Sequence, residues 1–493
     1  MIYTSRFSKT FFQVLFFVYI SIQQSFAQND TIWAPKTKPV SKVPWKHQYD
    51  QTLTMKLFLS QAEFDGKNKR KDNGKSTVYL TVTDALEVIK KIDNITLGIP
   101  KIIYLVGWQY NGHDSKYPAF FEGNERLKRP QDKNALESIR WLVQEAKQYH
   151  TMVSLHINMF DAYEDSPLWD EYVRHNIIAK KKDGSLLAGE WGYPISYAQE
   201  WKMGYTKKRI DSLCKLLPIQ QAGTIHIDAF HTWPPLPAVD SNGKAYLNFD
   251  KRPTSPYLNF TVADETAAQE KIFRYWASKG VDVTSEGVDF LRESDFAGLQ
   301  PMAWWFIRSA EDYLKYPASY YAGGVDNEEW GKIFGSSMHG EDIIKEDPKE
   351  LAKFPEQFMM NTAVWYYLNR LKRLYVVKGK DFKKAVFSNG VESMIEDGKY
   401  TLTQNGKLLA DDNSVNIPAW WISAPSYLIY SKTAVENQMY ILPDNFKKYK
   451  RVDIFSVNHD GQKVMLTEYT SNNSIRLSFS MSTAMLIVPH REK

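Results

Sequence analysis

The stretch KIIYLVGWQYNGHDS, residues 101–115, joins a short apolar run to a cluster of polar and aromatic residues, and this combination decides the fold. A continuously apolar run such as 101–106 is typical of a strand that is covered on both faces. The glycine, histidine and aspartate that follow it are typical of a loop that carries function. Because the same arrangement recurs along the chain, the stretch predicts one unit of a repeat.

Strands and helices alternate over the first half of the chain. We expect strands at Leu53–Leu59, 101–106, Met152–Ile157, Thr224–Ile227 and Val281–Thr284, and helices at Asp84–Asp93, Asn134–Tyr149, Glu200–Leu217 and Asp264–Lys279. Polar and aromatic residues gather directly after the strand ends, where a barrel keeps its active site. An open doubly wound sheet would show the same alternation, but the first strand lacks a following glycine-rich phosphate turn. The pattern therefore predicts an α/β fold, a (β/α)₈ barrel of the TIM type.

The second half of the chain changes character. Barrel units are expected at Pro301–Phe306, at Ala318–Gly323 and in a helix over Pro355–Leu374, and from Asp381 onward short alternating runs predict a C-terminal antiparallel β-sandwich domain. The expected organisation is a signal peptide at 1–27, an N-terminal linker at 28–50, the catalytic barrel at 51–378 and the β-sandwich at 379–493.

The first 27 residues have the pattern of a secretory signal peptide. Arg6 and Lys9 precede an apolar run from Phe11 to Ile22, and Ala27 ends a small-residue cleavage site. The run is too short to span a bilayer, which takes roughly 20 apolar residues. We therefore expect a secreted, periplasmic or cell-surface protein with no membrane span in the mature chain.

Composition excludes several classes of partner and site. The chain has 62 Lys and Arg against 57 Asp and Glu, and this near balance gives no electrostatic reason to expect nucleic acid as a partner. Cys214 is the only cysteine and lies in an apolar helical segment, so we interpret it as a buried hydrophobe. With 15 Trp and 29 Tyr, the chain has the ring-bearing residues that a carbohydrate cleft uses.

Two carboxylates stand at the ends of consecutive predicted strands. Asp228 ends the strand that begins at Thr224, and Glu286 follows the strand that begins at Val281. In a barrel such a pair can approach to the roughly 5–5.5 Å used by retaining glycosidases, where one carboxylate attacks the anomeric carbon and the other protonates the leaving oxygen. The sequence therefore predicts a retaining glycoside hydrolase.

Four segments, in order along the chain, resemble glycoside hydrolase family 101, the endo-α-N-acetylgalactosaminidases. They are Gly107–Pro118 with its Gly-His-Asp-Ser core, the His-x-Asn strand at Ser154–Asn158, Ile225–Asp228, and Thr284–Glu286. The resemblance covers about half of the chain. It implies an α-linked N-acetylgalactosamine or galactose-type glycan, such as an O-glycan or oligosaccharide, as substrate.

The resemblance also implies residue roles. Asp228 would be the nucleophile and Glu286 the acid/base, while Asp114 would bind hydroxyls of the sugar whose bond is cleaved. His113, His156 and Asn158 would contact the sugar or orient the groups that do. Further candidates for substrate binding are Trp108, His226, Trp233 and Trp304, with Trp191 and Trp305 as possible stacking platforms.

Three alternatives remain open from the sequence alone. The chain could be a carbohydrate-binding barrel protein without catalytic activity, or an exo-acting α-glycosidase of another specificity. A metal-dependent hydrolase built on His226, Asp228 and His231 is the third, although no His-x-His or His-Glu-x-x-His pattern supports it. The expectation is an enzyme with no metal and no cofactor.

Overall fold

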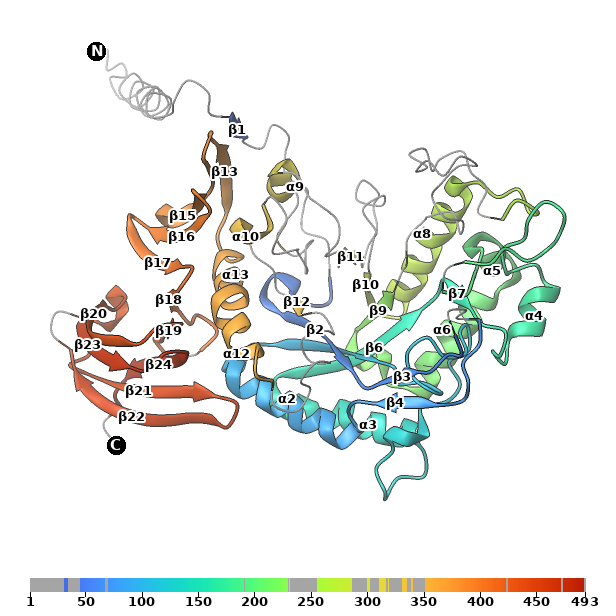
Figure 1. The fold of residues 1–493 in the computed structure, drawn as a ribbon, viewed down its shortest axis with the longest axis horizontal. Helices are drawn as coiled ribbons and strands as arrows, with labels where there is room; N and C mark the ends of the chain where they lie inside the picture. The colour runs from blue at the N-terminus through green and yellow to red at the C-terminus, as the bar shows by residue number, and fades with distance from the viewer. Residues whose placement is uncertain are drawn as a thin grey trace, which may run out of the picture.

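The computed structural model describes residues 45–66, 70–189, 191–228, 230, 255–285, 351–422, 424–470 and 473–491, with the short pieces 31–33, 299–301, 310–315, 318, 330–334 and 338–339. Figure 1 shows a part with a parallel sheet and helices beside a part made of antiparallel strands. Within the described ranges, no helix has both the length and the apolar character that a membrane crossing requires. The architecture is thus mixed α/β with a C-terminal antiparallel sheet domain, as the sequence predicts.

Seven parallel strands form the first sheet in the order β11-β10-β9-β6-β5-β2-β12. Their bounds are β2 Leu53–Phe58, β5 Lys101–Val106, β6 Thr151–Asn158, β9 Thr224–Asp228, β10 Asp282–Ser285, β11 Leu299–Pro301 and β12 Met338–His339. All neighbouring pairs are parallel, so the strands end along one edge, where Asn158 stands opposite Asp228. The late strand β12 pairs with the first strand, β2.

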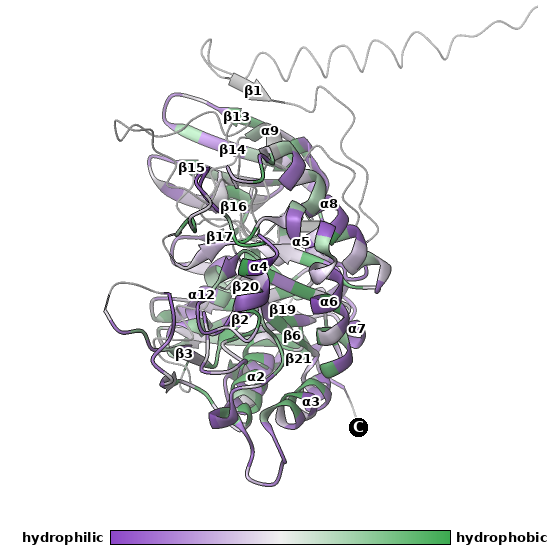
Figure 2. Ribbon diagram, turned by 90° about the vertical axis from the view of Figure 1, so that its right-hand side faces the viewer, coloured by the Kyte–Doolittle hydropathy of each residue, from purple (hydrophilic) through white to green (hydrophobic). Residues whose placement is uncertain are grey.

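Helices connect these strands. Their bounds are α2 Val82–Thr96, α3 Ala135–Glu145, α4 Trp169–Arg174, α5 Tyr197–Met203, α6 Tyr205–Leu216, α7 Ile219–Ala222 and α8 Val262–Ser278. In α2 a capping box between Thr81 and Asp84 satisfies the first backbone donors, and the buried apolar residues recur at helical spacing. Figure 2 shows the resulting mixture of hydrophobic and hydrophilic positions along α2 and α3.

The predicted single helix over Glu200–Leu217 is wrong, because the structure has two helices there. Gly204 adopts a left-handed backbone with φ of 80° and ends α5 before α6 begins. A residue without a Cβ enters that conformation at little cost, which makes glycine the usual helix terminator.

The amino-terminal end of the parallel sheet is closed by a polar cluster. The hydroxyl of Tyr49 donates to Thr224 at 3.0 Å and to Asp282 at 3.1 Å, and the Tyr104 hydroxyl lies 2.7 Å from the Thr224 hydroxyl. Backbone N–H groups of Lys46 and His47 also bond to Asp282. Asp282 therefore has a structural role at the end opposite to Asp228.

Two small ribbons extend the loops beyond the strand ends. β3 (Ser60–Ala62) follows β2 and pairs with β4 (Ser76–Val78), while β7 (Asp161–Ala162) follows β6 and pairs with β8 (Tyr193–Pro194). Both ribbons lie on the side of the sheet to which the parallel strands point, so they contribute to the walls around the strand ends.

Short helices lead into the C-terminal part: α9 Ala310–Lys315, α10 Gly331–Phe334, α12 Phe354–Gln357, a π-helical turn at Phe358–Thr362 and α13 Ala363–Leu368. The helix expected to continue to Leu374 ends at Leu368, because 373–378 joins the antiparallel sheet as β13. The segment Tyr375-Val376-Val377 is rich in aromatic and β-branched residues, which favour a strand.

Eleven strands form the antiparallel sheet, in the order β1-β13-β14-β15-β16-β17-β18-β19-β24-β21-β22, and β20 pairs with β23 in a second sheet. The bounds are β1 Thr31–Trp33, β13 Arg373–Lys378, β14 Phe382–Phe387, β15 Val391–Glu396, β16 Lys399–Gln404, β17 Lys407–Asp411, β18 Ser414–Pro418, β19 Tyr427–Ser431, β20 Val435–Ile441, β21 Arg451–Asn458, β22 Gly461–Tyr469, β23 Ser474–Phe479 and β24 Thr483–Pro489. β1 lies inside the predicted linker, and β13 precedes the predicted boundary at 379.

The two parts share one apolar core. A single hydrophobic cluster runs from the parallel strands through α12 and α13 to strands of the antiparallel sheet. A second hydrophobic cluster lies between the two-stranded sheet of β20 and β23 and the larger sheet. The side-chain amide of Asn94 on α2 also donates to the carbonyl oxygen of His459 at 2.8 Å. Because the core is continuous, the C-terminal part supports the parallel sheet as a packed neighbour.

Candidate active site

The loop after β5 follows its course because of two glycines. Gly107 and Gly112 have φ of 73° and 119°, and a Cβ on Gly107 would lie 1.8 Å from the carbonyl oxygen of Ser60. A Cβ on Gly112 would lie 2.8 Å from the backbone nitrogen of Ala62. Both positions therefore require glycine, since the loop passes directly against β3.

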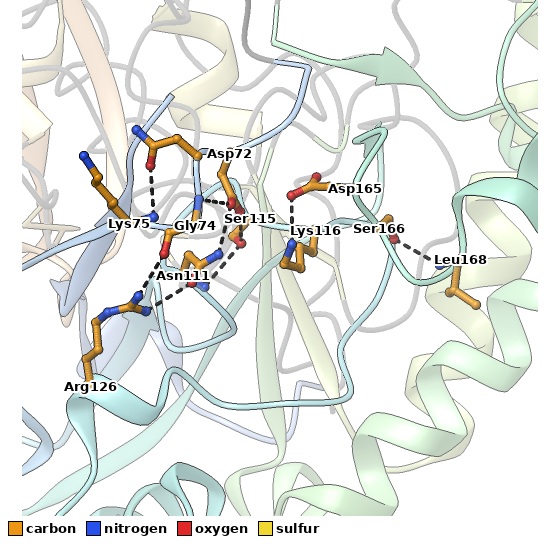
Figure 3. A network of polar contacts seen from close by, with 11 residues as sticks. Asp72, Gly74, Lys75, Asn111, Ser115, Lys116, Arg126, Asp165, Ser166 and Leu168 are labelled. Atoms are coloured by element: carbon orange, nitrogen blue, oxygen red, sulfur yellow. Dashed lines mark hydrogen bonds and ion pairs between the residues drawn. The ribbon is translucent and has the colours of Figure 1, made fainter. Parts of the chain in front are cut away.

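Asp72 fastens this loop to the turn before β4. One carboxylate oxygen accepts the side-chain amide of Asn111 and the backbone N–H of Gly74, both at 2.9 Å, and the other accepts the Ser115 hydroxyl at 2.6 Å. Arg126 adds bonds to Asn111 at 3.1 Å and to the Gly74 carbonyl at 2.9 Å. Figure 3 shows these contacts converging on one side of the loop. Sequence reasoning missed Asp72, which lies in an ordinary-looking polar turn.

The fastened loop carries Asp114 in an uncommon conformation. Tyr110, Asp114 and Lys116 all have positive φ, with values of 43°, 62° and 57°. Such conformations cost free energy in non-glycine residues and cluster at functional sites. Asp114 is only 4% exposed, and its Oδ1 lies 3.6 Å from Nε2 of His113. The loop thus holds the predicted sugar-binding pair together.

The end of β6 brings the His-x-Asn pair to the same edge. The Asn158 side-chain oxygen accepts the backbone N–H groups of Phe160 and Asp161 at 2.7 and 2.9 Å. Its backbone carbonyl accepts Nη2 of Arg209 at 3.1 Å, and Nη1 of Arg209 pairs with the buried Glu200 at 2.7 Å. These bonds fix the chain where β6 ends, so the orientation of Asn158 is set before any ligand arrives.

Asp228 lies at the end of β9 against His156. One carboxylate oxygen is 3.4 Å from Nε2 of His156, and the Asp228 side chain keeps 18% of its surface exposed while His156 keeps 2%. Burial lowers the pKa of His156, although the neighbouring Asp228 opposes that shift. A neutral imidazole leaves the charge of the neighbouring carboxylate uncancelled.

Two of the predicted site residues, His226 and Trp108, are fully buried. The rings of His113, His156 and His226 follow one another with centroid separations of 5.2 Å. His226 is fully buried, and its Nδ1 lies 3.0 Å from the Thr284 hydroxyl. Trp108 is also fully buried and donates its indole N–H to the His156 carbonyl at 3.0 Å. Both side chains therefore support the strand ends from the buried side.

Asp161 is a third carboxyl group at this edge that the sequence analysis did not assign. Its Oδ2 accepts the Asn158 amide at 2.7 Å, and the residue is 8% exposed. Burial and the charges of Asp114 and Asp228 raise the pKa of Asp161 to about 8. The nearby Tyr163 hydroxyl is buried and has no hydrogen-bond partner among the described residues. These unused polar groups favour a polar ligand.

Three predicted site residues, Glu286, Trp233 and Trp304, lie outside the described residues, as do His231 and Trp305. Glu286 comes directly after the last residue of β10, Ser285, which stands in register with Ile227. Trp191 is described and is 43% exposed.

His113, His156 and Asp228 have the composition of a possible metal site, with one ligand atom from each lying within 4.8 Å of the others. Histidines that bind a metal usually donate their second N–H to a carboxylate or carbonyl group. Among the described residues, Nδ1 of His113 and Nδ1 of His156 have no such partner. Within the described ranges, the two histidines thus lack the second hydrogen bond that usually orients a metal-binding histidine.

Two solved structures are similar to the chain at low identity. The first is the alpha-N-acetylgalactosaminidase NagBb from Bifidobacterium bifidum, with 11% identity and a TM-score of 0.47; the match covers 72% of this chain and 57% of that one. The second is the alpha-galactosidase from Lactobacillus brevis, with 14% identity and a TM-score of 0.40; the match covers 84% of this chain and 53% of that one. The chain thus spans somewhat over half the length of each.

The family comparison is more specific. Residues 73–279 match the family model described as endo-alpha-N-acetylgalactosaminidase. The match includes the loop after β5, the ends of β6 and β9, and the residues Asp114, Asn158 and Asp228. Over this segment the chain is similar to glycoside hydrolase family 101, and the match supports a glycoside hydrolase of that family or of a close relative.

Proposed function

We propose that the protein is a retaining α-glycoside hydrolase that cleaves α-linked N-acetylgalactosamine or galactose-type glycans. The observation that carries this proposal is the position of Asp228, a partly exposed carboxylate at a strand end that lies 3.4 Å from Nε2 of His156, within the matched family segment that also contains Asp114. An activity that needs a negatively charged nucleophile beside hydroxyl-binding groups fits this arrangement.

The reaction would proceed in two displacements. Asp228 attacks the anomeric carbon as the glycosidic bond breaks, and Glu286 gives its proton to the leaving oxygen. Glu286, now ionised, takes a proton from water, which attacks the glycosyl–Asp228 ester and restores both carboxyl groups. Asp114 would hold sugar hydroxyls throughout, while neutral His156 keeps Asp228 oriented.

The finer architecture belongs to the same proposal. Seven parallel strands in sequential order, with β12 beside β2, support closure into a (β/α)₈ barrel. The second core between β20–β23 and the larger sheet supports a β-sandwich. We also propose secretion after cleavage at Ala27, and N-terminal sequencing of exported protein should begin at or near Gln28.

Hydrolysis assays test the activity. The purified chain should release the aglycone from an aryl α-N-acetylgalactosaminide or an aryl α-galactoside, or release a disaccharide from an α-linked Galβ1-3GalNAc conjugate. Release of the intact disaccharide would indicate endo action, and release of single sugars would indicate exo action. Binding of these sugars without any hydrolysis would instead favour the non-catalytic alternative and contradict the proposal.

Asp114→Asn should weaken catalysis without unfolding the loop. Asparagine tolerates a positive φ nearly as well as aspartate, so the change removes charge while keeping the backbone conformation. Loss of charge-assisted hydrogen bonds to the sugar should cost about 1.5–3 kcal/mol of transition-state binding, roughly a ten- to hundredfold lower kcat/KM. An unchanged kcat/KM would place Asp114 outside the site.

Chelation tests the metal-dependent alternative. Incubation with excess EDTA followed by gel filtration should leave the hydrolysis rate unchanged, because the proposed mechanism uses only carboxyl groups and water. Loss of activity that returns when zinc is added would instead assign a metal to His113, His156 and Asp228.

A further inference from the structure

Asp161 occupies a position that the two-carboxylate mechanism does not use. It follows β6 by three residues, begins β7, and lies at the same edge of the sheet as Asp228. Its carboxyl group has one hydrogen bond among the described residues, from the Asn158 amide to Oδ2. Asn158 itself is fixed by two backbone N–H groups, so it holds the Asp161 carboxyl in a set orientation. The Oδ1 oxygen is left for another partner.

The surroundings of Asp161 oppose a negative charge. Among the described residues, five titratable groups interact with Asp161: Asp114 and Tyr117 after β5, Tyr163 after β7, Tyr197 on α5 and Asp228 on β9. Further titratable groups on the neighbouring elements are His156 on β6, Tyr193 on β8, Glu200 on α5, Arg209 on α6 and Glu265 on α8. The cation Arg209 is already bound to Glu200 and to the Asn158 carbonyl. Burial with two neighbouring carboxylates raises the pKa of Asp161 to about 8, so the group is mostly protonated at pH 7.

We propose that Asp161 binds the sugar as a neutral carboxylic acid, accepting the Asn158 amide at one oxygen and donating its O–H to an oxygen atom of the sugar. This inference rests on the proposed function, because it places the sugar against Asp228. A neutral donor also avoids adding a third negative charge beside Asp114 and Asp228.

A purely structural role accounts less well for the contacts. A buried carboxyl group that only anchors a loop normally has several hydrogen bonds, whereas Asp161 has one among the described residues. The hydroxyls of Tyr163 and Tyr197, both influenced by the charge of Asp161, are buried and likewise have no hydrogen-bond partner in the described part of the chain. A sugar with several hydroxyl groups would satisfy such a set.

Asp161→Asn and Asp161→Ala separate the two roles. An asparagine amide mimics the neutral acid, since its oxygen can accept from Asn158 while its NH₂ group donates. We expect the Kd for N-acetylgalactosamine, measured by calorimetry, to stay within about threefold of wild type at pH 6 in Asp161→Asn and to rise roughly ten- to hundredfold in Asp161→Ala. Above pH 8 the wild-type Kd should rise as the acid ionises, and the Kd of Asp161→Asn should not.

The outcomes distinguish this inference from the proposed function. If the wild-type chain hydrolyses no glycoside but the Kd values behave as described, the enzymatic proposal fails and the role of Asp161 stands. The role of Asp161 is overturned if hydrolysis occurs but Asp161→Asn weakens sugar binding as much as Asp161→Ala does. It is also overturned if the Kd of Asp161→Asn rises above pH 8 as the wild-type Kd does. Absence of any sugar binding also overturns it. Asp183→Asn, at an exposed turn, serves as the control for loss of a carboxylate.

Discussion

Asp228→Asn should abolish hydrolysis of every α-glycoside substrate, with kcat falling by about 10⁴-fold or more. The substitution preserves the shape of the side chain and its contact with His156, so the fold should survive. It removes the negative charge and the nucleophilic oxygen that form the glycosyl-enzyme, and the loss should therefore be equally severe for good and poor leaving groups. Kinetics with aryl substrates of graded leaving-group pKa measure this.

The matched control for Asp228→Asn is Asp183→Asn, which makes the same chemical change at an exposed turn and should retain wild-type kcat. In Asp228→Ala the smaller side chain leaves room for azide, which can attack the anomeric carbon directly. The product should then be the β-glycosyl azide, because a single displacement inverts an α linkage. Retention of more than a tenth of the wild-type rate in Asp228→Asn would contradict its role as nucleophile.

Glu286→Ala should affect natural and activated substrates differently. A sugar or peptide hydroxyl leaves poorly without a proton, so hydrolysis of natural glycans should fall by roughly 10²–10⁴-fold. A dinitrophenyl group leaves without protonation, so the first step should survive and the glycosyl-enzyme should accumulate, visible as a burst of dinitrophenol. Pre-steady-state kinetics measure the burst.

Azide provides the control for Glu286→Ala. The anion needs no base, so it should restore turnover of the activated substrate and yield the α-glycosyl azide, since two displacements retain the configuration. Equal damage to both substrate classes, with neither burst nor azide rescue, would remove Glu286 as acid/base. The two variants thus give azide products of opposite configuration, which distinguishes their roles without reference to rate.

The strands were the most predictable part of the fold. β5 matches its predicted range, and β9 ends one residue later than predicted, at Asp228. Continuous apolar runs bounded by polar residues leave little ambiguity about where a buried strand lies. The helices were less certain at their ends. Gly204 divides one predicted helix, and the residues after Leu368 leave the helix to form β13, which depends on pairing with strands far along the chain.

The site was most predictable where a residue ends a parallel strand. Asn158 and Asp228 meet at one edge because their strands are parallel neighbours, whereas Asp114 reaches its place through the loop after β5. Asp72 and Asp161 were missed for a different reason. Asp72 acts through Asn111 and Ser115, and the importance of Asp161 comes from burial beside two other carboxyl groups. The hydrogen bonds of Asp72 and the burial of Asp161 depend on residues far along the chain, so the local sequence does not predict them.

The anomeric configuration of the first product tests the central claim most directly. Wild-type enzyme is mixed with an aryl α-N-acetylgalactosaminide, or with the best α-linked substrate from the hydrolysis assays, and the anomeric protons are followed by NMR from the first minute. Double displacement through Asp228 predicts that the α-anomer appears first and that the β-anomer grows only through slow mutarotation. If the β-anomer forms first, a single displacement by water is at work and the assignment of Asp228 as nucleophile is contradicted.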